Sequence, residues 1–175
     1  MNQRVKSLAL AAAIAVTAAF LQAPAESAAY TFPTGQPLNP AFQGIISPLK
    51  SGTNVPVLLP VTLVGSPNTI VGQIVEVSTN SFTVQVSMGS QCPTAMYCRF
   101  GTVHGELTTS QTPPLTGIQV PFEPGITGYY LDAVCHANCN ESVLGFDYNG
   151  YQYTIGILAA PQANILTTAQ SLAQY

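Results

Sequence analysis

This chain has very little charge. Only 6% of its 175 residues are charged, with four Lys and Arg, seven Asp and Glu, and a formal net charge of −3. Arg4 and Lys6 lie at the extreme N-terminus, so Lys50 and Arg99 are the only basic side chains in the remainder. Nucleic-acid binding depends on basic side chains that displace phosphate counterions, and adhesion to an anionic membrane surface depends on the same charge. The composition therefore argues against both kinds of partner.

The sequence also lacks familiar catalytic motifs. It contains neither G-x-S-x-G nor H-E-x-x-H, and its few acidic residues form no recognisable pair for glycoside hydrolysis. His104 and His136 are its two histidines and the only candidates for a base near neutral pH. We therefore predict a protein that is not an enzyme, with no catalytic residue and no cofactor. A small secreted hydrolase that uses His104 or His136 is the alternative.

Its one long apolar run, Leu8 to Phe20, is shorter than the roughly 20 residues that span a bilayer. The basic residues that precede it and the small residues that follow it, at 23–25 or 27–29, are typical of a secretory signal peptide. We interpret residues 1–25 as this signal, with residue 29 as the latest cleavage point and an uncleaved anchor as the alternative. The mature protein is then secreted or periplasmic and has no membrane span.

The four cysteines all follow the predicted signal, and none forms a Cys-x-x-Cys redox motif. An even number of cysteines in an exported domain favours disulfide bonds. Three pairings exist, and the short segments that each pair brackets favour Cys92 with Cys98 and Cys135 with Cys139.

Metal sites are the alternative use of these residues. Zinc held by cysteines with His104 or His136 is disfavoured because C-x5-C and C-x3-C are not typical zinc spacings. Oxygen ligands for calcium also occur close together, but not in the order of an EF-hand loop: Asp132, Asn138, Asn140 and Glu141. We therefore predict no metal site.

Residues 26–54 are rich in proline, which interrupts both helices and strand ladders, so this segment is predicted to be a linker or an extended arm. Residues 55–175 are predicted to form one β-rich domain. It opens with the apolar run Val55 to Val64, whose two prolines suit an edge strand.

Two hairpins are predicted within this domain. Asn149-Gly150 is suited to a type I′ turn, which needs positive φ at both positions. The resulting register places Phe146 opposite Tyr153 on an apolar face, with the polar and small residues Gly145, Asp147, Gln152, Thr154 and Gly156 on the other. In Ile70 to Met88 a turn at Asn80-Ser81 places Val77 opposite Val84 and Val75 opposite Val86.

The chain is predicted to close with a helix that starts at Pro161, because apolar residues then recur along one helical face: Ile165, Leu166, Ala169, Leu172 and Ala173. About seven strands with short connections favour an antiparallel sheet. The predicted fold class is α+β, mainly antiparallel sheet with the C-terminal amphipathic helix packed on it. A β-sandwich is the alternative.

Tyrosines supply the candidate binding surface. Tyr129 and Tyr130 point to opposite sides of a predicted strand, while Tyr148 and Tyr151 flank the hairpin turn. Exposed aromatic rings are common at recognition surfaces. One of Tyr129 and Tyr130 should therefore be exposed or at a sheet edge, while packing within the sheet is the alternative role for Tyr148 and Tyr151.

The pattern S-x-L-x-F-x-x-N-G-x-x-Y-x-I, from Ser142 to Ile155, resembles exported bacterial β-rich proteins that carry a W/F-x-x-x-G-x-x-Y strand pair before a C-terminal helix, a domain of unknown function. Phe146 stands where tryptophan is usual in that pattern, and the paired cysteine loops are similar too. The resemblance implies export and a fold type, and carries over no catalytic or ligand-binding residue.

These observations predict an exported bacterial protein that acts as a non-enzymatic binding or envelope accessory module. Its partner is an envelope or extracellular protein or a glycan. Besides the hydrolase, a secreted protease inhibitor that presents the Cys92 to Cys98 loop remains as an alternative.

Overall fold

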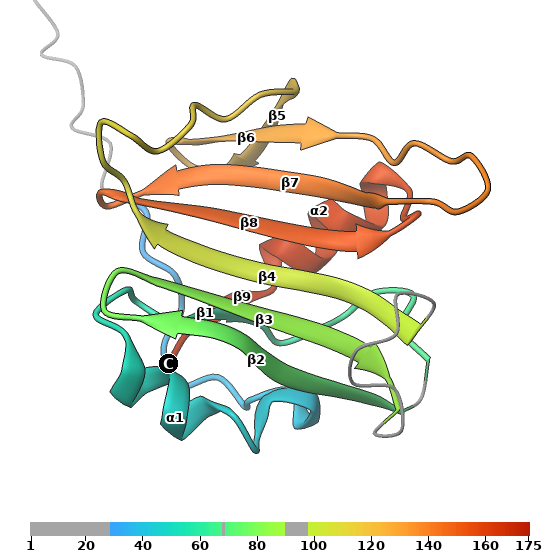
Figure 1. Ribbon diagram of the computed structural model, residues 1–175. Helices are drawn as coiled ribbons and strands as arrows, with labels where there is room; N and C mark the ends of the chain where they lie inside the picture. The colour runs from blue at the N-terminus through green and yellow to red at the C-terminus, as the bar shows by residue number, and fades with distance from the viewer. Residues whose placement is uncertain (1–28, 68, 90–97) are drawn as a thin grey trace, which may run out of the picture.

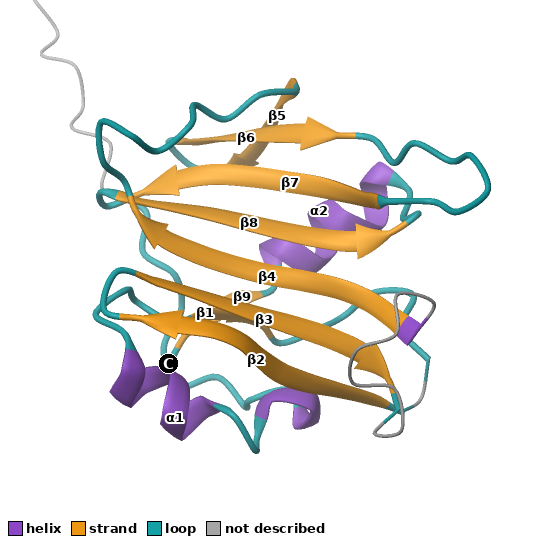
Figure 2. Ribbon diagram, in the orientation of Figure 1, coloured by secondary structure: helices purple, strands orange, loops and turns teal. Residues whose placement is uncertain are grey.

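The computed structural model describes residues 29–67, 69–89 and 98–175, which fold into two antiparallel sheets and two α-helices (Figures 1 and 2). The large sheet has the strand order β2-β3-β4-β8-β7-β6-β5. Its strands are β2 Ile70–Ser78, β3 Ser81–Met88, β4 Arg99–Leu107, β5 Ile118–Glu123, β6 Ile126–Leu131, β7 Glu141–Tyr148 and β8 Tyr151–Leu158. The predicted fold class is confirmed, because helix α2 (Gln162–Gln170) packs on one face of this mainly antiparallel structure.

The core lies on that same face of the large sheet, which we call the inner face. Helix α2 and the small sheet of β1 (Leu58–Pro60) and β9 (Leu172–Gln174) lie behind the large sheet in Figure 2. Between these layers the largest fully buried side chains meet: Tyr153, Phe42, Phe82, Phe146, Leu49, Leu58, Leu59, Leu144, Ile155, Ile165, Leu172 and Val84. The opposite, outer face has no helix across it in the view of Figure 2.

The described part of the proline-rich segment, residues 29–54, is built into this core. It forms the short 3-10 helix η1 (Pro40–Phe42) and helix α1 (Ile46–Gly52), and Phe32, Phe42 and Leu49 are almost fully buried. Phe42 packs over Gly72 of β2, where an added Cβ would lie 2.9 Å from its ring. The segment predicted as a linker or extended arm therefore belongs to the folded domain.

The hairpin at Asn149-Gly150 is confirmed. Both residues have positive φ, 51° and 82°, as a type I′ turn requires. Tyr148 pairs with Tyr151 and Phe146 with Tyr153, and the apolar side chains face the core. The opposite side is not fully exposed to solvent, because Gln152 is only 7% exposed and its amide donates to the Pro113 carbonyl.

The register predicted for the first hairpin is wrong. The turn residues are Thr79 and Asn80, Ser78 pairs with Ser81, and a bulge between Ile74 and Glu76 shifts the rest of the ladder. Val84 consequently pairs with Ile74, and Val75 is 62% exposed. The predicted register aligned valines only, whereas the observed one buries Phe82 completely. Tertiary packing of that ring outweighs local valine matching.

The predicted C-terminal helix is also too long. Helix α2 ends at Gln170, and Leu172 and Ala173 lie in β9, opposite Pro60 and Leu59 of β1. Both remain buried, as the helical spacing suggested, but on a strand. The Ser171 hydroxyl joins Thr62 to the end of the helix, accepting from the Thr62 N–H at 3.0 Å and donating to the Thr168 carbonyl at 2.7 Å. The chain therefore turns at Ser171 and closes the small sheet.

Candidate functional site

The four candidate tyrosines do not form one surface. Tyr129 is half-buried on the outer face of β6. Tyr130 is buried on the inner face, and its hydroxyl donates to Asp132 at 2.8 Å. Tyr148 and Tyr151 lie on the inner face beside the hairpin turn, where Tyr148 is 9% exposed and Tyr151 is half-buried. Only Tyr148 of the four lines a pocket at the hairpin tip.

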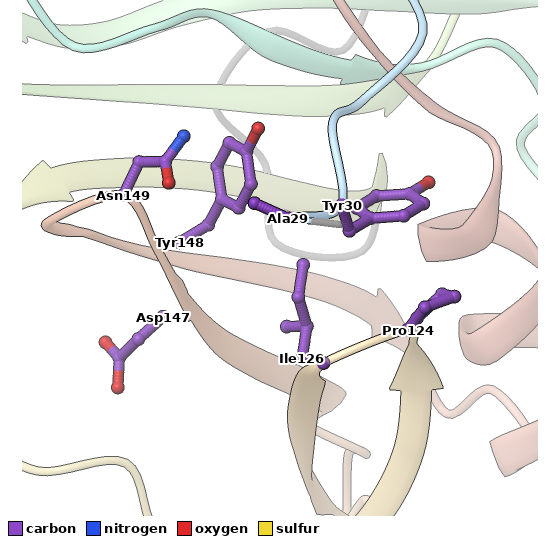
Figure 3. Close-up of a pocket in the computed structure, with 8 residues that line it drawn as sticks. Ala29, Tyr30, Pro124, Ile126, Asp147, Tyr148 and Asn149 are labelled. Carbon is purple, nitrogen blue, oxygen red and sulfur yellow. The ribbon is translucent and has the colours of Figure 1, made fainter. Parts of the chain in front are cut away.

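This tip pocket has a volume of about 360 Å³ and lies between the start of the described chain, the β5–β6 turn and the β7–β8 turn. Figure 3 shows the rings of Tyr30 and Tyr148 on either side of Ala29, with Ile126 below them. The carboxylate of Asp147 points away from both rings. The sequence analysis missed Tyr30, because it assigned residues 26–54 to a linker.

Aromatic packing holds both tyrosines of the pocket. The ring of Tyr148 lies edge-on to Phe32, with centroids 4.8 Å apart, and Tyr30 lies edge-on to the same phenylalanine at 5.1 Å. Phe32 also contacts the rings of Phe122 and Phe146 in the core. Edge-to-face pairs of this kind are favoured by the ring quadrupoles. Phe32 therefore anchors the N-terminal segment and places Tyr30 opposite Tyr148.

Burial also sets the electrostatics beside this pocket. It raises the pKa of the Tyr30 phenol, and the neighbouring Glu123 carboxylate raises it further. Burial likewise raises the pKa of Glu123, an effect partly offset by its hydrogen bond with Tyr30. Tyr30 is therefore a neutral phenol at physiological pH.

The disulfide between Cys135 and Cys139 is confirmed and closes a short loop between β6 and β7. Cys98 is buried and disulfide-bonded, while Cys92 lies outside the described residues, as does most of the loop proposed for protease inhibition. In the described ranges, no cluster of three or more His, Cys, Asp or Glu is arranged to hold a metal ion.

The four oxygen ligands considered for calcium have other partners. Asp132 accepts from the Tyr130 hydroxyl, and Asn140 accepts from the Val134 N–H at 2.6 Å. Glu141 accepts from Thr102 at 2.8 Å and lies 3.0 Å from Nε of Arg99. Asn138 uses its backbone carbonyl to accept from His136. The side chains of Asp132, Asn140 and Glu141 thus brace loops and strands individually.

His104 lies on the outer face between a hydroxyl and a carboxylate. Its Nδ1 is 2.9 Å from the Thr83 hydroxyl, and its Nε2 is 3.7 Å from Oε1 of Glu106, beyond hydrogen-bonding range. His136, by contrast, is exposed within the Cys135–Cys139 loop. Of the two histidines, only His104 has a hydroxyl and an acid beside it.

One catalytic pattern escaped the sequence analysis. Ser47-Pro48-Leu49-Lys50 matches S-x-x-K, in which serine is the nucleophile of penicillin-binding proteins and class A β-lactamases. Both Ser47 and Lys50 are exposed on α1, and no hydrogen bond joins their side chains. The accompanying S-D-N and K-T-G sequences are absent from the chain. The structure therefore shows no contact between the two side chains of this pattern.

None of the helices in the described ranges is long and apolar enough to cross a membrane. The tip pocket joins one predicted tyrosine, Tyr148, to a cavity of about 360 Å³. Compared with known proteins, the chain matches no family model, no curated protein and no solved structure.

Proposed function

We propose that this protein is an exported, non-enzymatic binding module whose tip pocket holds one uncharged ring of an envelope or extracellular glycan. The observation that carries the proposal is the pocket itself, where Tyr30 and Tyr148 bring two aromatic rings to a cavity of about 360 Å³. Ligand sites are typically concave and largely apolar, with a few polar groups that fix orientation. The tip pocket is concave, and its lining combines apolar and polar groups in similar measure.

The lining favours an uncharged ligand. Ile126 and Pro124 supply aliphatic surface, and the two phenol hydroxyls can exchange hydrogen bonds with sugar hydroxyls. The only ionisable carboxylate among the lining residues, that of Asp147, points away from the rings. The C–H face of a pyranose packs well on an aromatic ring, whereas a phosphate or carboxylate would find no lysine, arginine or histidine side chain among the lining residues.

Export is part of the same proposal. It is supported by the signal-like N-terminus and by the Cys135–Cys139 disulfide, because disulfides persist in oxidising compartments. Either cleavage point, residue 25 or residue 29, leaves Tyr30 in the mature chain. Non-reducing mass spectrometry of the protein in its host would show a shortened N-terminus and four missing thiol hydrogens. An intact N-terminus with free thiols would contradict export.

The binding experiment is a glycan array probed with the wild-type protein and with variants of the pocket. We expect Tyr30→Ala to abolish binding, because Tyr30 is half-buried at the pocket wall and its removal opens one side. Tyr148→Phe keeps the ring and its packing on Phe32, so it should retain most of the binding.

Tyr129→Ala is the matched control, since it removes an equally half-buried tyrosine from the outer face of the sheet. Glycan binding that survives Tyr30→Ala but is lost in Tyr129→Ala would overturn the tip pocket as the site. No binding to any glycan would overturn the ligand class.

A hydrolase that uses His104 is the second candidate, and a specific contact favours it. The Thr83 hydroxyl lies 2.9 Å from Nδ1 of His104, which is the distance of a nucleophile from its base. Assays with generic ester, peptide and glycan substrates should detect turnover that disappears in both His104→Ala and Thr83→Val. Activity that persists in both variants, or no activity in the wild type, would dismiss this candidate.

A further inference from the structure

A second concave site lies on the outer face of the large sheet, away from the tip pocket. Residues 108–117, which we call the strap, leave β4 and reach β5 at the edge of the sheet, so they must pass β8, β7 and β6. Between the strap and these strands lies a groove of about 200 Å³. Its apolar wall consists of Pro113, Pro114, Leu115, Tyr129, Leu131 and Val143.

The strap packs on β7 at a position where that strand lacks a side chain. Gly145 lies between Tyr129 and Thr154 in the register of the outer face. Leu115 of the strap fills this gap, since a Cβ at Gly145 would lie 2.5 Å from Cδ2 of Leu115. A second contact holds the strap to the sheet, because the buried side chain of Gln152 on β8 donates to the Pro113 carbonyl at 3.3 Å. Tyr129 is left half-buried beside this contact.

One carboxylate, that of Glu106, lines this groove, and a second, that of Asp147, lies beside its lining residue Gln152. Gln152 of β8 has one cross-strand neighbour on each side. Glu106 lies opposite it on β4, and Asp147 lies opposite it on β7. They are separated by two strand spacings, about 10 Å. The Gln152 amide donates to Asp147 at 3.4 Å, and the imidazole of His104 approaches Glu106 no closer than 3.7 Å.

Neither carboxylate has a lysine or arginine partner in the described part of the chain. Arg99 lies 3.0 Å from Glu141, and Lys50 is on α1, which packs beside β2 at the far edge of the sheet (Figure 1). An apolar groove beside acids that no lysine or arginine neutralises is complementary to a ligand that combines apolar and cationic groups. The tyrosine ring adds a surface that also attracts cations.

We propose that this groove binds a peptide segment of a partner protein in which lysine or arginine flanks leucine-like residues. The apolar side chains of the peptide pack against Leu115, Leu131 and Val143 of the groove. Its lysine or arginine groups lie near the carboxylates of Glu106 and Asp147. Asp147 also belongs to the lining of the tip pocket, whereas Glu106 and Tyr129 line the groove alone, so Glu106→Gln is the variant that separates the two sites.

The test uses blocked tetrapeptides as probes, Lys-Leu-Leu-Lys against the charge-reversed Glu-Leu-Leu-Glu, titrated into the isotopically labelled protein and followed by NMR. We expect amide shift changes at Tyr129, Gly145 and Gln152 with the cationic peptide and none with the anionic one. Glu106→Gln and Asp147→Asn should each weaken binding about two- to fivefold, as expected for exposed ion pairs.

Glu76→Gln is the matched control, because it removes the same charge from an exposed position on the edge strand β2. It should leave the affinity unchanged, and the thermal midpoints of all three variants should stay close to that of the wild type. Equal binding of both peptides, unchanged affinity in Glu106→Gln and Asp147→Asn, or shift changes confined to the tip pocket would each overturn the proposal. Those outcomes leave the glycan proposal standing, since its own variants lie at Tyr30 and Tyr148.

Discussion

Single residues decide how the strands of the large sheet approach one another. Gly105 of β4 lies between Phe82 of β3 and Tyr153 of β8, the strands on either side. Both rings lie over the glycine, and both are almost completely buried. The absence of a side chain at this position is therefore what lets the two aromatic rings occupy the core.

We expect Gly105→Ala to destabilise the fold by about 1–3 kcal/mol, the usual cost of overpacking a core. Its Cβ would lie 2.7 Å from the Phe82 ring and 2.9 Å from the Tyr153 ring, and both rings are almost completely buried. Urea unfolding measures the change. Gly44→Ala is the control, because nothing lies within 4 Å of a Cβ there. Equal stability of the two variants would contradict this account of Gly105.

The cysteine loop acts at the scale of one element. Cys135 and Cys139 are only 4 positions apart and join two residues of the connection between β6 and β7. Around this loop Ser142, which is completely buried, donates to the Ala160 carbonyl at 2.7 Å and accepts from the Ala133 N–H. These hydrogen bonds connect the end of the loop to the start of helix α2.

We predict that Cys135→Ser combined with Cys139→Ser lowers the free energy of unfolding by at most about 2 kcal/mol, because so short a loop removes little entropy from the unfolded chain. The far-ultraviolet circular dichroism spectrum should stay unchanged. Hydrogen exchange should quicken within 132–141 and nowhere else. Loss of the folded state would show that the bond is essential to the domain and refute this estimate.

At the scale of the whole molecule, buried tyrosines link stability to alkaline pH. Burial raises the pKa of four phenols above the ordinary value of 10.0, those of Tyr30, Tyr130, Tyr153 and Tyr175. The effect is largest for Tyr153, whose hydroxyl also donates to the Pro56 carbonyl at 2.9 Å. In the unfolded chain these phenols ionise near pH 10, whereas in the folded protein they stay protonated.

Each raised phenol therefore contributes stability that is fully present below pH 10 and is lost as the pH rises beyond it. We expect the free energy of unfolding to fall steeply above pH 10, with tyrosinate absorbance appearing mainly as the protein unfolds. Tyr153→Phe should flatten this decline. A variant that declines as steeply as the wild type would rule out Tyr153 as a main contributor.

Some of this architecture was predictable because its signals are local. The Asn149-Gly150 turn, the alternation in β7 and β8 and the Cys135–Cys139 bond each depend on residues a few positions apart. The bulge at Val75 and the burial of Phe82 were not predictable, since they depend on how β2 and β3 pack against the rest of the core. The place of Tyr30 in the tip pocket was not predictable for the same reason, because Tyr30 lies opposite Tyr148 only through the packing of both rings on Phe32.

The sequence by itself determined the fold class and the turn of the last hairpin, because periodicity and turn chemistry act over neighbouring residues. Only the tertiary structure decided that Leu172 and Ala173 form a strand, that Phe32 anchors the N-terminal segment, and that Gly145 receives Leu115. Each of these outcomes joins parts of the chain that are far apart in sequence, and a buried contact between them outweighs local propensity.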